Sequence, residues 1–151
     1  MTRRETPLDA AAILRALADH GVDYVVIGGM AVQAHGHTRT TQDLDLVPEP
    51  SAVNLARLAA AAHALGVTAD IDFRESIAIT LETSAGGLDV HLRPPGAAPY
   101  ARLRARALEL DVAGLKVAVA GLDDLIAMKR ASGRPIDRGD VIALTQADQP
   151  A

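Results

Sequence analysis

The chain has 151 residues, 49% of them hydrophobic and 23% charged, which is typical of a globular domain and excludes a disordered segment. It contains no cysteine, which excludes disulfides, thiolate zinc sites and a cysteine nucleophile. A net charge of −4 argues against a protein that coats nucleic acid through a basic surface. Since neither a signal peptide nor an apolar run of about 18 residues is present, we expect one cytoplasmic domain over residues 1–151 with no membrane contact.

The first half of the chain predicts helices alternating with strands. The order is a helix over 7–20, a buried strand over 23–27, a short helix over 30–35, a strand over 43–47 and a helix over 51–65. The first strand is a β-branched run, whereas the second alternates strictly between acidic and apolar residues. Glycine or proline follows each element, as expected at its end.

The second half predicts two hairpins and two further helices. The strands 77–82 and 88–92 form the first hairpin, and two apolar runs within 106–120 form the second. Helices are expected over 122–130 and 137–146. The whole pattern predicts an α+β fold: a mixed β-sheet of about four to six strands flanked by helices, with short C-terminal helices.

The segment between the two hairpins is less regular. Pro94-Pro95-Gly96 marks a loop. Beyond it, Arg102, Arg104 and Arg106 alternate with apolar residues and would share one face if the segment is extended. Such a face is either a patch for tRNA or an ordinary solvated surface.

Three aspartates carry the chemistry that the sequence suggests. Asp43 and Asp45 lie two residues apart on a strand, so their side chains project from the same face. Two like charges at that spacing repel each other, and a divalent cation removes the conflict. Asp89 lies on a later strand between apolar neighbours and can supply a third carboxylate. Oxygen ligands suit Mg²⁺ or Mn²⁺, and three carboxylates on neighbouring strands suit phosphoryl displacement with two metals.

A glycine pair precedes these aspartates. Gly28 and Gly29 separate the first strand from a short helix, where the absence of a Cβ lets phosphate oxygens approach the backbone. The loop that follows contains Arg39 and Thr40, and an arginine there can bind a phosphate with two hydrogen bonds. Together these features predict a nucleoside-triphosphate site.

The arrangement Gly28-Gly29, then Asp43-Leu44-Asp45, then Leu88-Asp89-Val90 resembles the minimal nucleotidyltransferases of the DNA polymerase β superfamily. The segments 28–36 and 39–45 look most like the AbiEii-type toxin branch. The tail, with Lys129, Asp137 and Asp140, is also similar to that branch, in which a lysine and an aspartate flank the active centre. The resemblance extends from about Asp19 to Leu144.

The resemblance implies a nucleotidyltransferase-like sheet and a Mg²⁺- or Mn²⁺-dependent enzyme. It would transfer NMP from an NTP such as ATP to a hydroxyl on tRNA, a protein or a small molecule, as a possible part of a toxin–antitoxin system with a cognate partner. A homodimer is left open. The implied residues are Asp43, Asp45 and Asp89 for catalysis and metal binding, and Gly28, Gly29, Arg39, Thr40 and Lys129 for the nucleotide.

Other interpretations of the same residues remain. The aspartates could be solvated surface acids, Arg39 an ordinary loop arginine and Lys129 a surface lysine. His91 shares a face with Asp89, and we expect it to hydrogen-bond a metal ligand rather than bind the metal itself. Met30 follows the glycine pair where many superfamily members have serine. The alternative function is therefore a catalytically degenerate or antitoxin-like binding module of the same fold.

Overall fold

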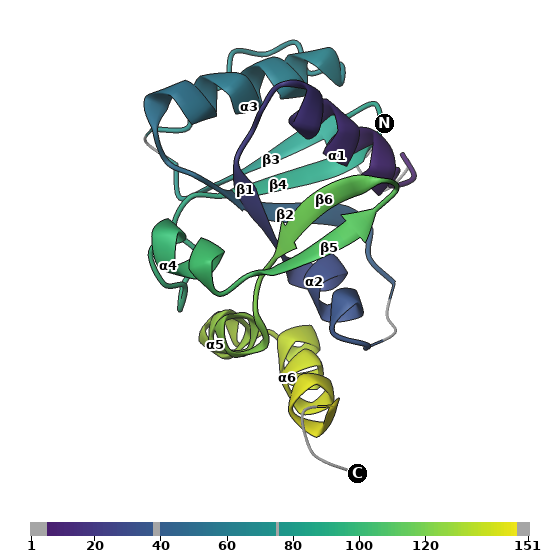
Figure 1. Cartoon of the computed structure of the whole chain (residues 1–151), viewed down its shortest axis with the longest axis vertical. Helices are drawn as coiled ribbons and strands as arrows, with labels where there is room; N and C mark the ends of the chain where they lie inside the picture. The colour runs from purple at the N-terminus through teal and green to yellow at the C-terminus, as the bar shows by residue number, and fades with distance from the viewer. Residues whose placement is uncertain (1–5, 38–39, 75, 148–151) are drawn as a thin grey trace.

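A computed structural model describes residues 6–37, 40–74 and 76–147, and these ranges contain six helices and six strands (Figure 1). In chain order the elements are α1 (Ala10–Asp19), β1 (Tyr24–Ile27), α2 (Gly28–Ala34), β2 (Asp43–Pro48), α3 (Ala52–Ala64), β3 (Ala78–Thr83), β4 (Gly86–His91), α4 (Tyr100–Ala105), β5 (Leu108–Val112), β6 (Leu115–Val119), α5 (Leu122–Ser132) and α6 (Pro135–Ala147). Within the described ranges, every helix is too short or too polar to cross a membrane.

The six strands form one mixed sheet in the order β3-β4-β2-β1-β6-β5. The pairs β1–β6 and β2–β4 are parallel, whereas β1–β2, β3–β4 and β5–β6 are antiparallel. Helices flank the sheet, and α5, with 11 residues, and α6, with 13, are the last two elements in chain order (Figure 1). The predicted α+β class and the size of the sheet are thus confirmed.

The two faces of the sheet have different coverings. The helices α1 and α3 lie together on one side of it, and α2, α5 and α6 lie on the other (Figure 1). On β2 the alternation of the strand turns Leu44 and Leu46, both fully buried, toward one face and the two aspartates toward the other. The core is built mainly from Leu, Ile, Val and Ala, with Phe73 as its single buried phenylalanine. The aspartates therefore stand on a rigid strand whose opposite face is packed.

The buried side-chain amide of Asn54 joins α3 to the start of β1 and the end of β2. Asn54 is only 2% exposed. Its Nδ2 donates to the carbonyl oxygens of Asp23, at 2.9 Å, and Glu49, at 2.7 Å, while its Oδ1 accepts from the N–H of Asp23 at 2.8 Å. Because a buried polar group is costly unless it is hydrogen-bonded, this set specifies how α3 docks where β1 begins and β2 ends.

The segment around the three arginines is a helix, so the condition under which they would share one extended face is not met. Arg102 and Arg104 lie on α4, where residues two apart project about 200° from each other. Arg106 caps that helix, and its Nη1 lies 2.9 Å from Asp124 Oδ1. The buried side chain of Leu103, packed into the core, explains why the segment folds as a helix.

Several helix starts also differ from the sequence prediction, and α1 begins at Ala10 rather than at Pro7. The helix α2 begins at Gly28, directly after β1, rather than at Met30. The helix α6 begins at Pro135 rather than at Asp137. Proline fits the first position of a helix because the N–H that it lacks has no partner there in any helix. Pro135 therefore starts α6 as well as separating it from α5.

Candidate active site

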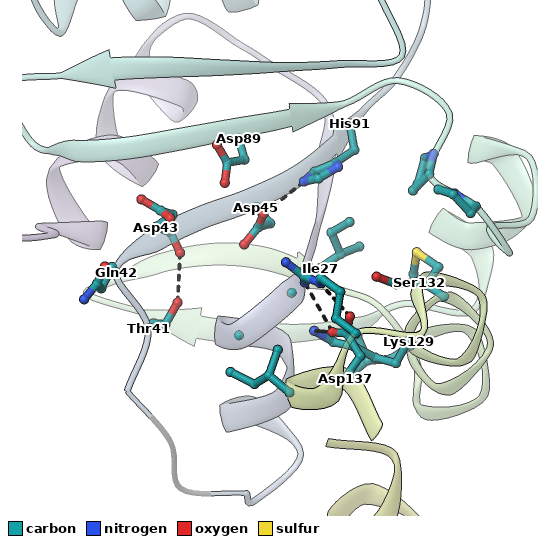
Figure 2. A pocket seen from close by; sticks show the side chains of 18 of the residues that line it. Ile27, Thr41, Gln42, Asp43, Asp45, Asp89, His91, Lys129, Ser132 and Asp137 are labelled. Carbon is teal, nitrogen blue, oxygen red and sulfur yellow. Dashed lines mark hydrogen bonds and ion pairs between the residues drawn. The ribbon is translucent and has the colours of Figure 1, made fainter. Parts of the chain in front are cut away.

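The three aspartates predicted to act together lie side by side. Asp45 on β2 is the direct partner of Asp89 on the parallel strand β4, and Asp43 lies two residues earlier on β2. Neighbouring strands are about 4.8 Å apart, so carboxyl groups on one face of such a pair are within reach of a single ion. All three side chains are partly buried, and Figure 2 shows their carboxyl groups gathered together.

These carboxyl groups line a cleft of about 730 Å³ between the sheet and α5 and α6. Seven of the eight residues proposed from the sequence line this cleft: Gly28, Gly29, Thr40, Asp43, Asp45, Asp89 and Lys129. The eighth, Arg39, lies outside the described residues. Beside Thr40, the hydroxyl of Thr41 donates to the carbonyl oxygen of Asp43 at 3.0 Å, which joins this loop to the start of β2.

The backbone of Gly28 lies close against the carboxyl group of Asp45. Its φ is +70°, a conformation that side chains other than glycine rarely adopt, and a Cβ built there would lie 2.5 Å from Asp45 Oδ2. The backbone of Gly28 therefore occupies the space against which the Asp45 carboxyl group rests. The carboxyl group of Asp45 leaves no room for a side chain at this position, so a glycine is required.

His91 adds an imidazole to the carboxylates. It follows Asp89 by two residues on β4, and its Nε2 lies 2.9 Å from Asp45 Oδ1. The expected hydrogen bond to one of the three aspartates is thus confirmed. Asp45, Asp89 and His91 each offer one ligand atom, and these three atoms lie within 4.8 Å of one another.

Lys129 lies in the wall opposite the carboxylates but is itself buried, with a side-chain exposure of 8%. Its Nζ lies 3.1 Å from Asp137 Oδ1 and 3.3 Å from Asp140 Oδ2, both on α6. His37 Nε2 lies 3.9 Å from Asp140 Oδ1. Figure 2 shows Lys129 and Asp137 in contact beneath the carboxylates. The ammonium group of Lys129 thus joins α5 to α6 in this wall of the cleft.

Asp137 is fully buried, yet it is held as a carboxylate. Burial raises its pKa, but hydrogen bonds from Arg134, Ser132 and Lys129 together outweigh burial and hold that pKa well below its usual range. Arg134 donates from Nε to Asp137 Oδ2 at 2.7 Å and from Nη2 to Oδ1 at 3.3 Å. The side chain of Arg134 is 67% exposed and lines the cleft, where Asp137 holds its guanidinium in place.

Sequence reasoning missed part of the cleft wall. Pro94 and Pro95, identified only as a loop, line the cleft, and so do Met128 and Arg134. These residues come from segments far from the aspartates in the sequence, and no local pattern indicates that they meet. Arg134 stands in the tail that resembles the AbiEii-type branch, but the resemblance assigns it no role.

Several solved structures share this fold. A lincosamide antibiotic adenylyltransferase, LnuA, determined with lincomycin bound, has a TM-score of 0.68 at 16% identity, and the match covers 93% of this chain and 99% of that one. The protein ANT(2'')-Ia, in complex with adenylyl-2''-tobramycin, gives 0.62 at 20% identity over 91% and 86%. An antigenic nucleotidyltransferase-like protein from Paracoccidioides brasiliensis gives 0.57 at 19% identity over 96% and 80%.

These similarities establish that the chain has the fold of nucleotidyltransferases. At such low identity they establish the fold alone. No protein-family model matches the sequence, and no curated protein sequence matches it significantly. The activity must therefore be argued from the side chains in the cleft.

Proposed function

We propose that this chain is a metal-dependent nucleotidyltransferase that transfers NMP from an NTP to a hydroxyl group and releases pyrophosphate. The observation that carries the proposal is the placement of Asp43, Asp45 and Asp89 on one face of β2 and β4, lining the cleft. The nucleotidyltransferase fold supports the same conclusion. Like charges so close together, with the other sheet face packed, are expected at a site that binds cations.

The donor set fits Mg²⁺ or Mn²⁺. Asp45 and Asp89 are register partners, and Asp43 projects from the same face, so hard oxygen ligands converge from two strands. When bound, such ions neutralise phosphate charge and orient the α-phosphorus. Asp89 is proposed to accept the proton of the attacking hydroxyl. The acceptor oxygen forms a bond to the α-phosphorus, the bond from this phosphorus to the β-phosphate oxygen breaks, and pyrophosphate leaves.

The nucleotide is proposed to lie along Gly28, Gly29 and Thr40, which line the cleft next to the carboxylates. Arg39 and Lys129 are proposed to neutralise the triphosphate, as the family resemblance implies. Lys129 already pairs with two carboxylates, and these partly cancel the positive potential that its ammonium group produces in the cleft. Arg134, whose side chain is exposed and lines the cleft, is proposed to supplement this potential, and its charge too is shared with a carboxylate, that of Asp137.

The acceptor is proposed to be a hydroxyl of a small molecule. Two proteins of this fold are antibiotic adenylyltransferases or carry an adenylylated antibiotic, which favours this class. A tRNA end or a protein hydroxyl, the acceptors expected of the AbiEii-type branch and of a toxin–antitoxin pair, are the competing possibilities. The same transfer chemistry serves all three acceptors, so the experiment must include each of them.

The test is incubation of the purified chain with each α-³²P-labelled NTP, Mg²⁺ or Mn²⁺, and one acceptor class at a time. The classes are aminoglycosides and lincosamides, total tRNA, and protein. We expect label transfer with equimolar pyrophosphate release, lost in Asp89→Asn and retained in Asp111→Asn, whose carboxylate is exposed on β5. NTP binding with no release of pyrophosphate from the NTP in the presence of any of the acceptors would contradict the proposal and favour the binding-module alternative.

A further inference from the structure

The imidazole of His91 meets two of the proposed metal ligands at close range. Its Nε2 is 2.9 Å from Asp45 Oδ1, and one ligand atom from each of Asp45, Asp89 and His91 lies within 4.8 Å of the others. His91 and Asp89 are two residues apart on β4 and project from the same face, as Figure 2 shows. The imidazole thus lies beside the carboxyl groups of Asp45 and Asp89, on the same face of the sheet.

This spacing is close to that of a single coordination sphere. Ligands about 2.1 Å from an octahedral ion lie about 3.0 Å apart when adjacent and about 4.2 Å apart when opposite. One pair of donor atoms, His91 Nε2 and Asp45 Oδ1, is 2.9 Å apart, and all three lie within 4.8 Å, somewhat beyond the widest of these separations, so side-chain rotations would be needed to bring all three onto one ion. The strands themselves are held by the β2–β4 register and need not move.

The chemistry of the third donor distinguishes this site from a purely carboxylate one. Mg²⁺ takes oxygen ligands and keeps several waters, whereas imidazole nitrogen suits first-row transition metals. A nitrogen ligand therefore raises affinity for Mn²⁺ and for the metals that follow it in the Irving–Williams order, with little gain for Mg²⁺.

We infer that His91 is a direct metal ligand, so that Asp45, Asp89 and His91 form a mixed oxygen–nitrogen centre that selects a transition-metal ion over Mg²⁺. The inference rests on the metal site of the proposed function. Ligation by Nε2 requires the tautomer with hydrogen on Nδ1, whereas a hydrogen bond donated to Asp45 requires hydrogen on Nε2. The two roles exclude each other at that atom, and one spectrum distinguishes them.

The experiment is pulsed EPR of Mn²⁺ bound to the full chain, combined with calorimetric titration of Mn²⁺ and Mg²⁺. We expect ¹⁴N modulation from a directly bound imidazole in the parent chain and its loss in His91→Gln. The Mn²⁺ affinity of that variant should fall about tenfold or more while the Mg²⁺ affinity changes much less. The control is His63→Gln, because His63 is an exposed residue near the end of α3 and does not line the cleft.

Mn²⁺ binding without ¹⁴N modulation would overturn the inference, as would an equal loss of Mn²⁺ and Mg²⁺ affinity in His91→Gln. Either result would leave His91 as a hydrogen-bonding partner of Asp45 and leave the proposed transferase activity standing. If the parent chain fails to bind Mn²⁺ at all, both this inference and the proposed metal dependence are overturned.

Discussion

At the scale of single residues, Gly28 joins the two halves of the sequence motif. The sequence predicts a phosphate site at the glycine pair and metal ligands at the aspartates. The structure places the backbone of Gly28 directly against the carboxyl group of Asp45. A side chain at Gly28 would therefore disturb the carboxylates as well as the backbone. Sequence reasoning identified Gly28 as important, but it could not find this contact because the contact depends on the β1–β2 register.

We predict that Gly28→Ala lowers the affinity for Mn²⁺ in addition to lowering the free energy of unfolding through backbone strain. The control is Gly21→Ala, because Gly21 has almost the same φ, +67°, with nothing within 4 Å of a built Cβ. Each variant should lose about 1–2 kcal/mol of unfolding free energy from the positive φ. Only Gly28→Ala should also lose Mn²⁺ affinity, because its Cβ displaces Asp45. Chemical denaturation and calorimetric titration measure the two effects, and equal Mn²⁺ affinity in both variants would contradict the account.

At the scale of elements, α5 and α6 are held together by buried charge. The sequence predicts both helices, and the resemblance singles out Lys129. Neither predicts that the ammonium group lies between Asp137 and Asp140 with little exposure to solvent, because that depends on how α6 docks. Removing one partner from a buried ion pair leaves an uncompensated charge, so Lys129 contributes to stability whatever its part in nucleotide binding.

We predict that Lys129→Met destabilises the fold by about 3–5 kcal/mol, near the lower end because Arg134 still pairs with Asp137. The matched control is Lys116→Met, whose partner Asp111 is 3.6 Å away with both side chains more than 70% exposed. That variant should change stability by less than about 1 kcal/mol. Urea unfolding of both proteins provides the measurement. Parent-like stability of Lys129→Met would show that the lysine serves only the cleft.

Acid should weaken the same junction. The pKa of Asp137 is held below its usual value in the folded state, so its stabilising contribution is present above the unfolded pKa of about 3.9 and is lost as the pH falls through and below that value. We predict a melting temperature that begins to fall at about pH 4 and keeps falling at lower pH, toward the depressed pKa of the folded state. In Arg134→Gln, which removes one of the groups lowering this pKa, the fall should level off at a higher pH. Thermal unfolding followed by circular dichroism at each pH measures the two profiles. Identical profiles down to the lowest pH would show that Asp137 does not govern acid stability.

At the scale of the whole molecule, sequence and structure agree on the order of the elements and on the sheet face that carries the carboxylates. Periodicity sufficed there, because the alternation of acidic and apolar residues in 43–46 fixes which side chains face together. Periodicity left the conformation around the three arginines open, and the structure has a helix there, α4, with Leu103 buried. The cleft could not be predicted in full either, since its walls join Pro94 and Pro95 to residues of α5 and α6 through tertiary contacts alone.

The central claim is that the carboxylates on β2 and β4 form a metal and nucleotide site in this cleft. The most direct test is a crystal structure of the chain with Mn²⁺ and a non-hydrolysable NTP, with the metal located by anomalous scattering. The account predicts manganese bound by Asp43, Asp45 and Asp89, about 3.5–4 Å apart if two ions bind, with the triphosphate along Gly28 and Gly29. Manganese or nucleotide bound away from these three aspartates would contradict it.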